Sequence, residues 1–223
     1  SKVTDKTFNK SVSVLICSKN EAENLKILLP YFQKQSYKNF ELVLINDCST
    51  DDTINILKDF KEKSSLNIKI VDVELVEQFW GNKKYALTLG IKAASNEHLL
   101  FTDADCIPLS DDWIADMTSN FSSEMQIVLG YGAYEKVKHS FLNKIIRFET
   151  LLTAIQYFTY AKIGMPYMGV GRNLAYTKSL FFKVNGFMNH MNVRSGDDDL
   201  FINSVATRNN TAICLSEKSF TQS

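Results

Sequence analysis

Short apolar runs and helix-like spacings alternate along the first hundred residues of the chain. The runs predict buried strands at residues 11–17, 40–46, 67–73 and 99–102. Between them, apolar residues recur three or four positions apart and predict helices at residues 23–35, 53–63 and 82–95. This alternation predicts an α/β fold with a mostly parallel central sheet, flanked by helices on both faces through right-handed crossovers.

The second half of the chain has a less regular pattern. It predicts helices at residues 113–121, 141–161, 179–184 and 199–207, and strands at residues 126–135 and 212–215. Residues 164–176 contain Gly169, Gly171 and Pro166, so we expect a bend there. No repeat, linker or low-complexity segment interrupts the pattern, which predicts a single domain over residues 1–223.

Two carboxylates, Asp103 and Asp105, follow the predicted strand at residues 99–102. Open α/β sheets bind their ligands at the carboxyl ends of the strands. Hard divalent cations prefer carboxylate oxygens, so this pair is a candidate site for Mg²⁺ or Mn²⁺ against phosphate oxygens. The alternative is a polar strand end that caps the next helix.

Three further polar clusters, at residues 18–21, 46–47 and 196–199, follow predicted strands or lie in loops able to reach the same edge. The last contains Asp197, Asp198 and Asp199, whose mutual repulsion needs a cation, a helix N-terminus or solvent to offset it. These carboxylates also suit the first turn of the predicted helix 199–207, and the two roles are compatible.

The composition of the chain argues against several classes of protein. Lys+Arg and Asp+Glu are equal at 25 each, so no net charge attracts the chain to nucleic acid or anionic lipid. The cysteines lie far apart without Cys-x-x-Cys spacing, which is typical of reduced cytosolic thiols. There is no signal peptide and no unbroken apolar run of membrane length, so we expect a cytoplasmic chain.

Five sequence blocks, in order, resemble family 2 glycosyltransferases. They are Ser-Val-Ser-Val-Leu-Ile-Cys-Ser-Lys-Asn-Glu, Leu-Ile-Asn-Asp-Cys-Ser-Thr-Asp-Asp-Thr, Gly-Asn-Lys-Lys-Tyr-Ala-Leu, Phe-Thr-Asp-Ala-Asp and Gly-Asp-Asp-Asp-Leu-Phe-Ile-Asn. The resemblance spans residues 12–203 and implies the GT-A fold, a nucleotide-diphosphate sugar donor, a divalent metal and inversion at the anomeric carbon. It also implies a nucleotide-sugar half at about residues 11–106 and an acceptor half at about residues 107–223.

The resemblance also implies roles for single residues. Donor-binding roles fall on Ser18, Asn20, Glu21, Asp47, Lys83 and Asp103. Within that set, Asp47 meets the base of a UDP-sugar and Lys83 lies near the ribose or phosphates. Asp105, with Asp103 beside it, holds Mg²⁺ or Mn²⁺, and Asp198 is the base that deprotonates the acceptor hydroxyl, with Asp197 as its alternative.

The second half of the chain contains weaker indications of how an acceptor binds. The resemblance implies that this acceptor is a glycan or a lipid-linked sugar. Arg172 and Asn173 are similar to the family's acceptor-side loop. The apolar stripe at residues 141–161 predicts ordinary core packing, with an acceptor wall or a membrane-surface face as alternatives. His190 precedes the acidic cluster but lacks a second His at ligand spacing, so we expect no metal role for it.

Two departures from the family pattern and two rival functions remain open. The Gln-x-x-Arg-Trp block of processive members is absent, so either the chain stops short of it or the enzyme does not use it. Many members of the family also carry membrane helices beyond the catalytic domain, and this sequence contains none, which suggests an excised catalytic domain with any membrane association carried by segments outside it, at the cytoplasmic face. A haloacid-dehalogenase-like phosphatase also places Asp-x-Asp after a strand, but after its first core strand and followed by Thr or Val where Ile107 stands. A catalytically silent nucleotide-sugar-binding domain is the other alternative.

Overall fold

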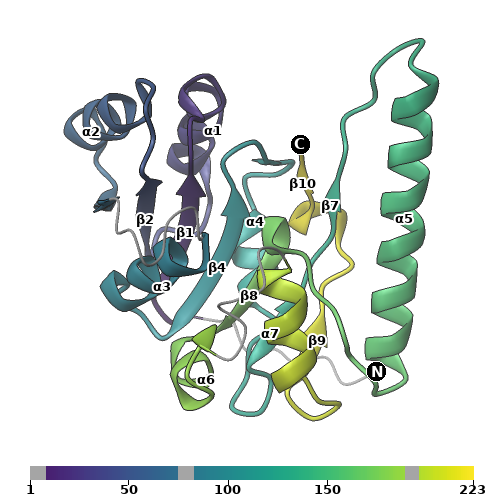
Figure 1. Cartoon of the computed structure of the whole chain (residues 1–223). Coiled ribbons are helices and arrows are strands. Elements are labelled where there is room, and N and C mark those ends of the chain that lie inside the picture. The colour runs from purple at the N-terminus through teal and green to yellow at the C-terminus, as the bar shows by residue number, and fades with distance from the viewer. Residues whose placement is uncertain (1–8, 75–82, 189–195) are drawn as a thin grey trace.

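The central sheet of the protein has seven strands in the order β3-β2-β1-β4-β8-β6-β9. The structure is a computed structural model that describes residues 9–74, 83–188 and 196–223. Its strands are β1 Val12–Ser18, β2 Phe40–Asp47, β3 Asn67–Val73, β4 His98–Asp103, β6 Ile127–Leu129, β8 Leu174–Thr177 and β9 Thr211–Ile213. The helices between them are α1 Ala22–Lys34, α2 Thr53–Lys63, α3 Lys83–Ala93, α4 Trp113–Thr118, α5 Phe141–Lys162, α6 Lys178–Lys183 and α7 Asp197–Val205 (Figure 1).

The first half of the chain confirms the predicted parallel sheet. β1 pairs in parallel with both β2 and β4, and β2 pairs in parallel with β3. The predicted helix at residues 82–95 is α3, although Asn82 lies outside the described residues. Because all four strands run in one direction, their carboxyl ends meet at one edge of the sheet.

Two apolar clusters cover the two faces of this sheet, because successive strand residues point to opposite sides. On one face, Val14 and Leu42 pack with residues of α1, α2 and α4. On the other, Leu15 and Val43 pack with residues of α3, α5, α6 and α7. The β-strands therefore read as nearly continuous apolar runs, as expected for strands buried on both faces.

The second half departs from the prediction in its strands. β8 lies in the stretch expected only to bend, and it pairs antiparallel with β4 and with β6. The expected strand at residues 126–135 divides into β6 and the short β7 Gly132–Ala133. β7 joins β5 Ile107–Pro108 and β10 Thr221–Gln222 in a separate three-stranded sheet. Strands of two residues carry too little periodicity for a sequence pattern to reveal them.

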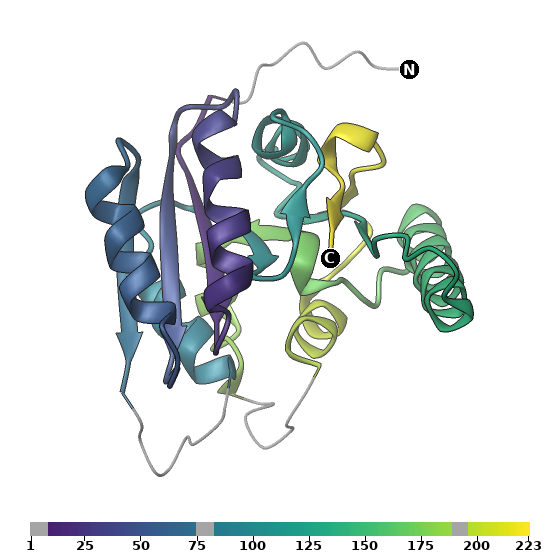
Figure 2. The ribbon, with the colours of Figure 1, turned by 90° about the horizontal axis from the view of Figure 1, so that it is seen from above.

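Helix α5 contradicts the expectation of ordinary core packing. It forms over the predicted residues but stands at the side of the molecule away from α1 and α2 (Figures 1 and 2). Phe148 is 65% exposed, whereas Phe158, one of the few residues of α5 that reach the core, is only 9% exposed. The rest of the predicted stripe is exposed at Leu142, Ile145, Leu152 and Ile155 and half-buried at Ile146. Despite this exposed apolar surface, no helix within the described ranges is long and apolar enough to cross a bilayer.

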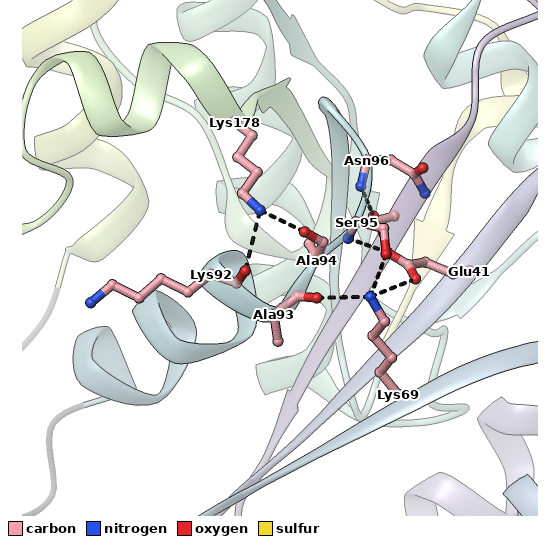
Figure 3. Close-up of polar contacts among 9 residues, drawn as sticks. Glu41, Lys69, Lys92, Ala93, Ala94, Ser95, Asn96 and Lys178 are labelled. Atoms are coloured by element: carbon pink, nitrogen blue, oxygen red, sulfur yellow. Dashed lines mark hydrogen bonds and ion pairs between the residues drawn. The ribbon is translucent and has the colours of Figure 1, made fainter.

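A buried carboxylate holds the C-terminal end of α3 against the sheet (Figure 3). Glu41, at the amino end of β2, accepts hydrogen bonds from Ser13 Oγ at 2.6 Å and from the Ser95 backbone N–H at 2.6 Å. Lys69 Nζ lies 3.2 Å from Glu41 Oε2 and donates to the carbonyl of Ala93 at 2.9 Å. Positive charge at the last carbonyls of a helix is favourable, so this network fixes where α3 ends.

The Glu41→Gln variant should lower the free energy of unfolding by about 2 kcal/mol at about pH 7, because it removes the charge of a buried carboxylate that accepts hydrogen bonds from Ser13 and Ser95 and pairs with the partly exposed Lys69. Burial alone would raise the pKa of Glu41, but hydrogen bonds from Ser13 and Ser95 and the Lys69 charge outweigh it and lower that pKa. The contribution of Glu41 is therefore complete above the carboxyl pKa of the unfolded chain and disappears as pH falls through the lower folded-state pKa.

Urea denaturation of the wild type and the variant, at about pH 7 and again at about pH 3, checks this expectation. Glu62→Gln, at an exposed position of α2, is the matched control and should change little. An equal stability loss at both pH values would show that the Glu41 charge is not what stabilises this end of α3.

Candidate active site

The carboxyl edge of the parallel sheet brings together three strand ends, two of which carry an acidic residue. Cys17 of β1 pairs with Ile45 on one side and with Asp103 on the other. Asp47 ends β2, so it lies two strands away from Asp103 at the same edge and two residues further along. With neighbouring strands about 4.8 Å apart and a rise of about 3.3 Å per residue, the Cα atoms of Asp47 and Asp103 lie roughly 12 Å apart across β1.

Lys83, the first residue of α3, forms an ion pair with Asp103 at the end of β4. Lys83 Nζ lies 2.8 Å from Asp103 Oδ1. Burial would lower the pKa of Lys83, but the charges of Asp103 and Asp198 and the hydrogen bond to Asp103 outweigh it and raise that pKa above its usual range. The lysine is therefore a fixed positive charge at this edge of the sheet.

Asp103 and Asp105 lie close enough to share a cation. One carboxylate oxygen of each and the Cys106 sulfur all lie within 4.8 Å of one another. Burial, together with the charges of Asp105 and Asp103, raises the pKa of the Cys106 thiol. A protonated thiol is a poor metal ligand, whereas two carboxylates suit a hard cation, so the donor set fits Mg²⁺ or Mn²⁺. Cys106 was not singled out from the sequence, because its place beside the pair depends on the turn after β4.

A cavity of about 430 Å³ opens beside this ion pair. Lys83 and Asp103 line one wall, and Asp198 and Asp199 from the first turn of α7 line another. The remaining wall is the loop at residues 168–172. Gly171 permits this approach, because a Cβ atom there would collide with the Asp198 carboxylate. Two acidic clusters more than 90 positions apart in the sequence therefore share one cavity.

The structure does not describe the side chains of two residues considered from the sequence, Asp197 and His190. Asp197 is the first residue of α7, but the position of its side chain is not described. His190 lies outside the described residues.

The residues expected to bind the nucleoside lie at the ends of β1 and β2, where hydrogen bonds connect the loops that follow the two strands. The Asn20 side-chain oxygen accepts from the Thr50 backbone N–H at 2.8 Å, and the Glu21 backbone N–H donates to Thr53 Oγ1 at 3.0 Å. Asp47 is only 7% exposed, and Lys19 Nζ lies 3.9 Å from one of its oxygens. Asp47, Asn20 and Glu21 thus lie at two adjacent strand ends whose following loops are held together by hydrogen bonds.

Ser18 and Asn173 have structural roles that the sequence did not indicate. Ser18 is buried and its hydroxyl donates to the Ile45 carbonyl at 3.0 Å, which ties β1 to β2. Asn173 is 0% exposed; it accepts from Trp113 Nε1 at 3.1 Å and donates to the Ser219 carbonyl at 2.7 Å. This burial corrects the expectation that the Asn173 side chain faces an acceptor.

Arg172, in contrast, lies on the cavity wall with its guanidinium 4.5 Å from the centre of the Tyr134 ring. Its backbone carbonyl accepts hydrogen bonds from Thr102 Oγ1 at 3.1 Å and Thr221 Oγ1 at 3.0 Å. The loop that carries Arg172 is therefore anchored to β4 and to the small sheet.

Solved structures with the same fold are glycosyltransferases of the GT-A class. A mannosyltransferase from Pyrobaculum calidifontis, in complex with GDP-Man and Mn²⁺, superposes with a TM-score of 0.75 at 20% identity, over 97% of this chain and 57% of that one. Staphylococcus aureus TarS in complex with UDP gives a TM-score of 0.69 at 20% identity, over 96% of this chain and 60% of that one. The fold is therefore GT-A.

The chain belongs to the family described as Glycosyl transferase family 2, whose profile matches residues 13–185. The poly-beta-1,6-N-acetyl-D-glucosamine synthase of Staphylococcus epidermidis is 31% identical over 137 residues, which covers 56% of this chain and 32% of the relative. This chain thus spans about a third of that protein's length. Family membership confirms the resemblance read from the five blocks and leaves the phosphatase alternative without support.

Replacing Asp105 with Asn should weaken Mn²⁺ binding about tenfold or more, because an amide is a poorer ligand for a hard cation than a carboxylate. Cys106→Ser, which keeps the shape of the neighbouring side chain, should leave that affinity within about twofold. Titration of Mn²⁺ by electron paramagnetic resonance, with UDP present, measures both variants. Equal losses in both would mean that the thiol is a ligand and that the oxygen-only donor set is wrong.

Proposed function

We propose that the chain catalyses inverting transfer of a sugar from a UDP-sugar to a hydroxyl group of a glycan or lipid-linked acceptor, with a divalent metal. The observation that carries this proposal is the cavity that Asp198 shares with the Lys83–Asp103 pair. A base and a fixed positive charge that line one cavity are what attack on a sugar and departure of a diphosphate both require.

In this proposal the donor lies along the carboxyl edge of the sheet. Asp47 accepts a hydrogen bond from the N–H of uracil, with Asn20 and Glu21 beside it, and the diphosphate reaches Lys83 and Asp103. The roughly 12 Å between the Cα atoms of Asp47 and Asp103 leaves room for a nucleoside between the two side chains. Asp105, with Asp103, would hold Mg²⁺ or Mn²⁺; when bound, the cation neutralises the charge that develops on the leaving diphosphate.

The chemistry at the acceptor is a proton transfer coupled to substitution. The acceptor oxygen forms a bond to the anomeric carbon from the face opposite the diphosphate, the bond from that carbon to the diphosphate oxygen breaks, and the acceptor proton passes to Asp198. Asp197 is the alternative base. The fixed positive charge of Lys83 stabilises the departing diphosphate, because its raised pKa keeps it protonated.

The relatives support the type of substrate. One is described as a synthase of poly-beta-1,6-N-acetyl-D-glucosamine, and TarS has been solved in complex with UDP-GlcNAc. The P. calidifontis structure holds Mn²⁺, which favours a divalent metal in this fold. We extend these features to this chain as one catalytic domain, with donor half 11–106 and acceptor half 107–223. Its four free cysteines favour a reducing, cytoplasmic compartment, at the membrane face if further segments anchor it.

The Asp198→Asn variant should lose about 10²–10⁴-fold in turnover, because the acceptor hydroxyl no longer has a base. Its affinity for UDP with Mn²⁺ should stay close to that of the wild type, since the donor binds on the other walls of the cavity. The measurement is UDP release from UDP-GlcNAc and UDP-glucose in the presence of Mn²⁺, with calorimetric titration of UDP as the binding readout.

Asp111→Asn, an exposed change of the same chemistry, is the matched control and should keep wild-type turnover. Wild-type turnover in Asp198→Asn would remove Asp198 as the base and leave Asp197 to be tested. UDP binding without any turnover in the wild type would favour the silent nucleotide-sugar-binding domain instead.

A further inference from the structure

A second cavity, of about 320 Å³, lies between α5 and the loop that borders the first cavity. Met168, Val170 and Arg172 line both cavities, so the two are adjacent across this loop. The volume is at the lower end of the range for small-molecule sites, which is about 300–1,000 Å³. We propose that this second cavity binds one sugar ring of the acceptor, preferably an N-acetylhexosamine; this inference rests on the proposed function.

One side of the second cavity is aromatic and held in place. Tyr157 is buried, and its hydroxyl donates to the Gly130 carbonyl at 2.7 Å. Tyr131 packs edge-to-face on Phe220 with ring centres 5.0 Å apart, and the Tyr134 ring lies 4.5 Å from the Arg172 guanidinium. Tyr157 is only 1% exposed and supports this side of the cavity, whereas the partly exposed Tyr131 and Tyr134 rings can offer apolar faces to the C–H side of a pyranose. Because these rings are already held in place, the ordering cost on binding is small.

The α5 side of the cavity mixes polar and apolar residues, whereas the outer face of the same helix is apolar. Glu149, Thr150 and Thr153 line the cavity beside Ile146, Ala154 and Tyr157, while Leu151 and Leu152 are exposed to solvent. A helix that only packed on the core would place its leucines, rather than its threonines, on this side. Two hydroxyl residues and a carboxylate residue in the lining suit a ligand that carries several hydroxyl groups.

The charges and the apolar residues of the lining further restrict the type of ligand that this cavity suits. The Glu149 carboxylate faces the same cavity as the Arg172 guanidinium, so the lining has no excess of positive charge and does not favour a phosphate. Ile146, Ala154 and Met168 add small apolar surfaces, which suit the methyl group of an N-acetyl substituent. A neutral acetylated sugar therefore fits better than a nucleotide or a phosphorylated ligand.

The position of the loop gives this sugar a route to the proposed base. Gly171 contacts the Asp198 carboxylate, and the next residue, Arg172, passes over Gly132 into the second cavity; a Cβ atom on Gly132 would collide with the Arg172 side chain. A ring held against Tyr134 and Arg172 would therefore lie on the other side of this loop from Asp198. The proposal places one of its hydroxyl groups at the border that Met168, Val170 and Arg172 form between the two cavities.

The test measures binding of two probes, methyl and octyl N-acetyl-β-D-glucosaminide, to the chain saturated with UDP and Mn²⁺. Saturation-transfer difference NMR gives the Kd of each probe. Tyr134→Ala and Thr153→Val should raise the Kd of the probes about tenfold, while Thr159→Val, on the exposed face of α5, should leave it within about twofold. The affinity for UDP with Mn²⁺ should be unchanged in all three variants.

The outcomes separate this inference from the proposed function. Unchanged probe affinity in both Tyr134→Ala and Thr153→Val overturns the inference, as does a wild type that binds UDP with Mn²⁺ but neither glucosaminide. A wild type that does not bind UDP with Mn²⁺ overturns the proposed function and the inference with it. Tighter binding of the octyl than of the methyl probe, with the same loss in the variants, supports a lipid-linked acceptor; equal binding supports a free glycan.

Discussion

Parallel pairing of β1 with both β2 and β4 is the constraint on which the candidate site depends. It places Asp47 and Asp103 at the same edge of the sheet with one strand between them. The Lys83–Asp103 ion pair then joins the first residue of α3 to the end of β4, while Glu41 and Lys69 hold the last carbonyls of α3 at the opposite edge of the sheet. Fixing both ends of α3 keeps a positive charge where a diphosphate would need it.

The sequence predicted this half of the molecule well, because its signals are local and repeated. The predicted bounds of β3 and α2 agree with the structure, and Asp103 and Asp105 lie at the expected end of β4. The sequence also indicated that the cluster at residues 196–199 reaches the same edge, and the cavity shared by Asp103 and Asp198 agrees with this. It did not reveal that Ser18 and Asn173 are buried, since only the packed structure shows which polar side chains bond within the protein.

The second half of the chain was harder to predict, because its form depends on contacts between distant segments. β8 is four residues long and owes its place to antiparallel neighbours from β4 and β6. In α5 the apolar spacing correctly indicated a helix, but spacing alone does not say which side faces the protein. The side that carries Thr150 and Thr153 lines a cavity, and the side that carries Phe148 is exposed. In such a helix, a prediction that assigns the more apolar face to the protein core chooses the wrong face.

A crystal structure of the chain with UDP and Mn²⁺ would show directly whether the donor binds at this edge of the sheet. We expect the Mn²⁺ ion at about 2 Å from a carboxylate oxygen of Asp105, the uracil against Asp47, and the Asp198 carboxylate on the side of the diphosphate that the metal leaves free. A nucleotide bound away from the carboxyl edge of β1, β2 and β4, or an ion held by other residues, would contradict it.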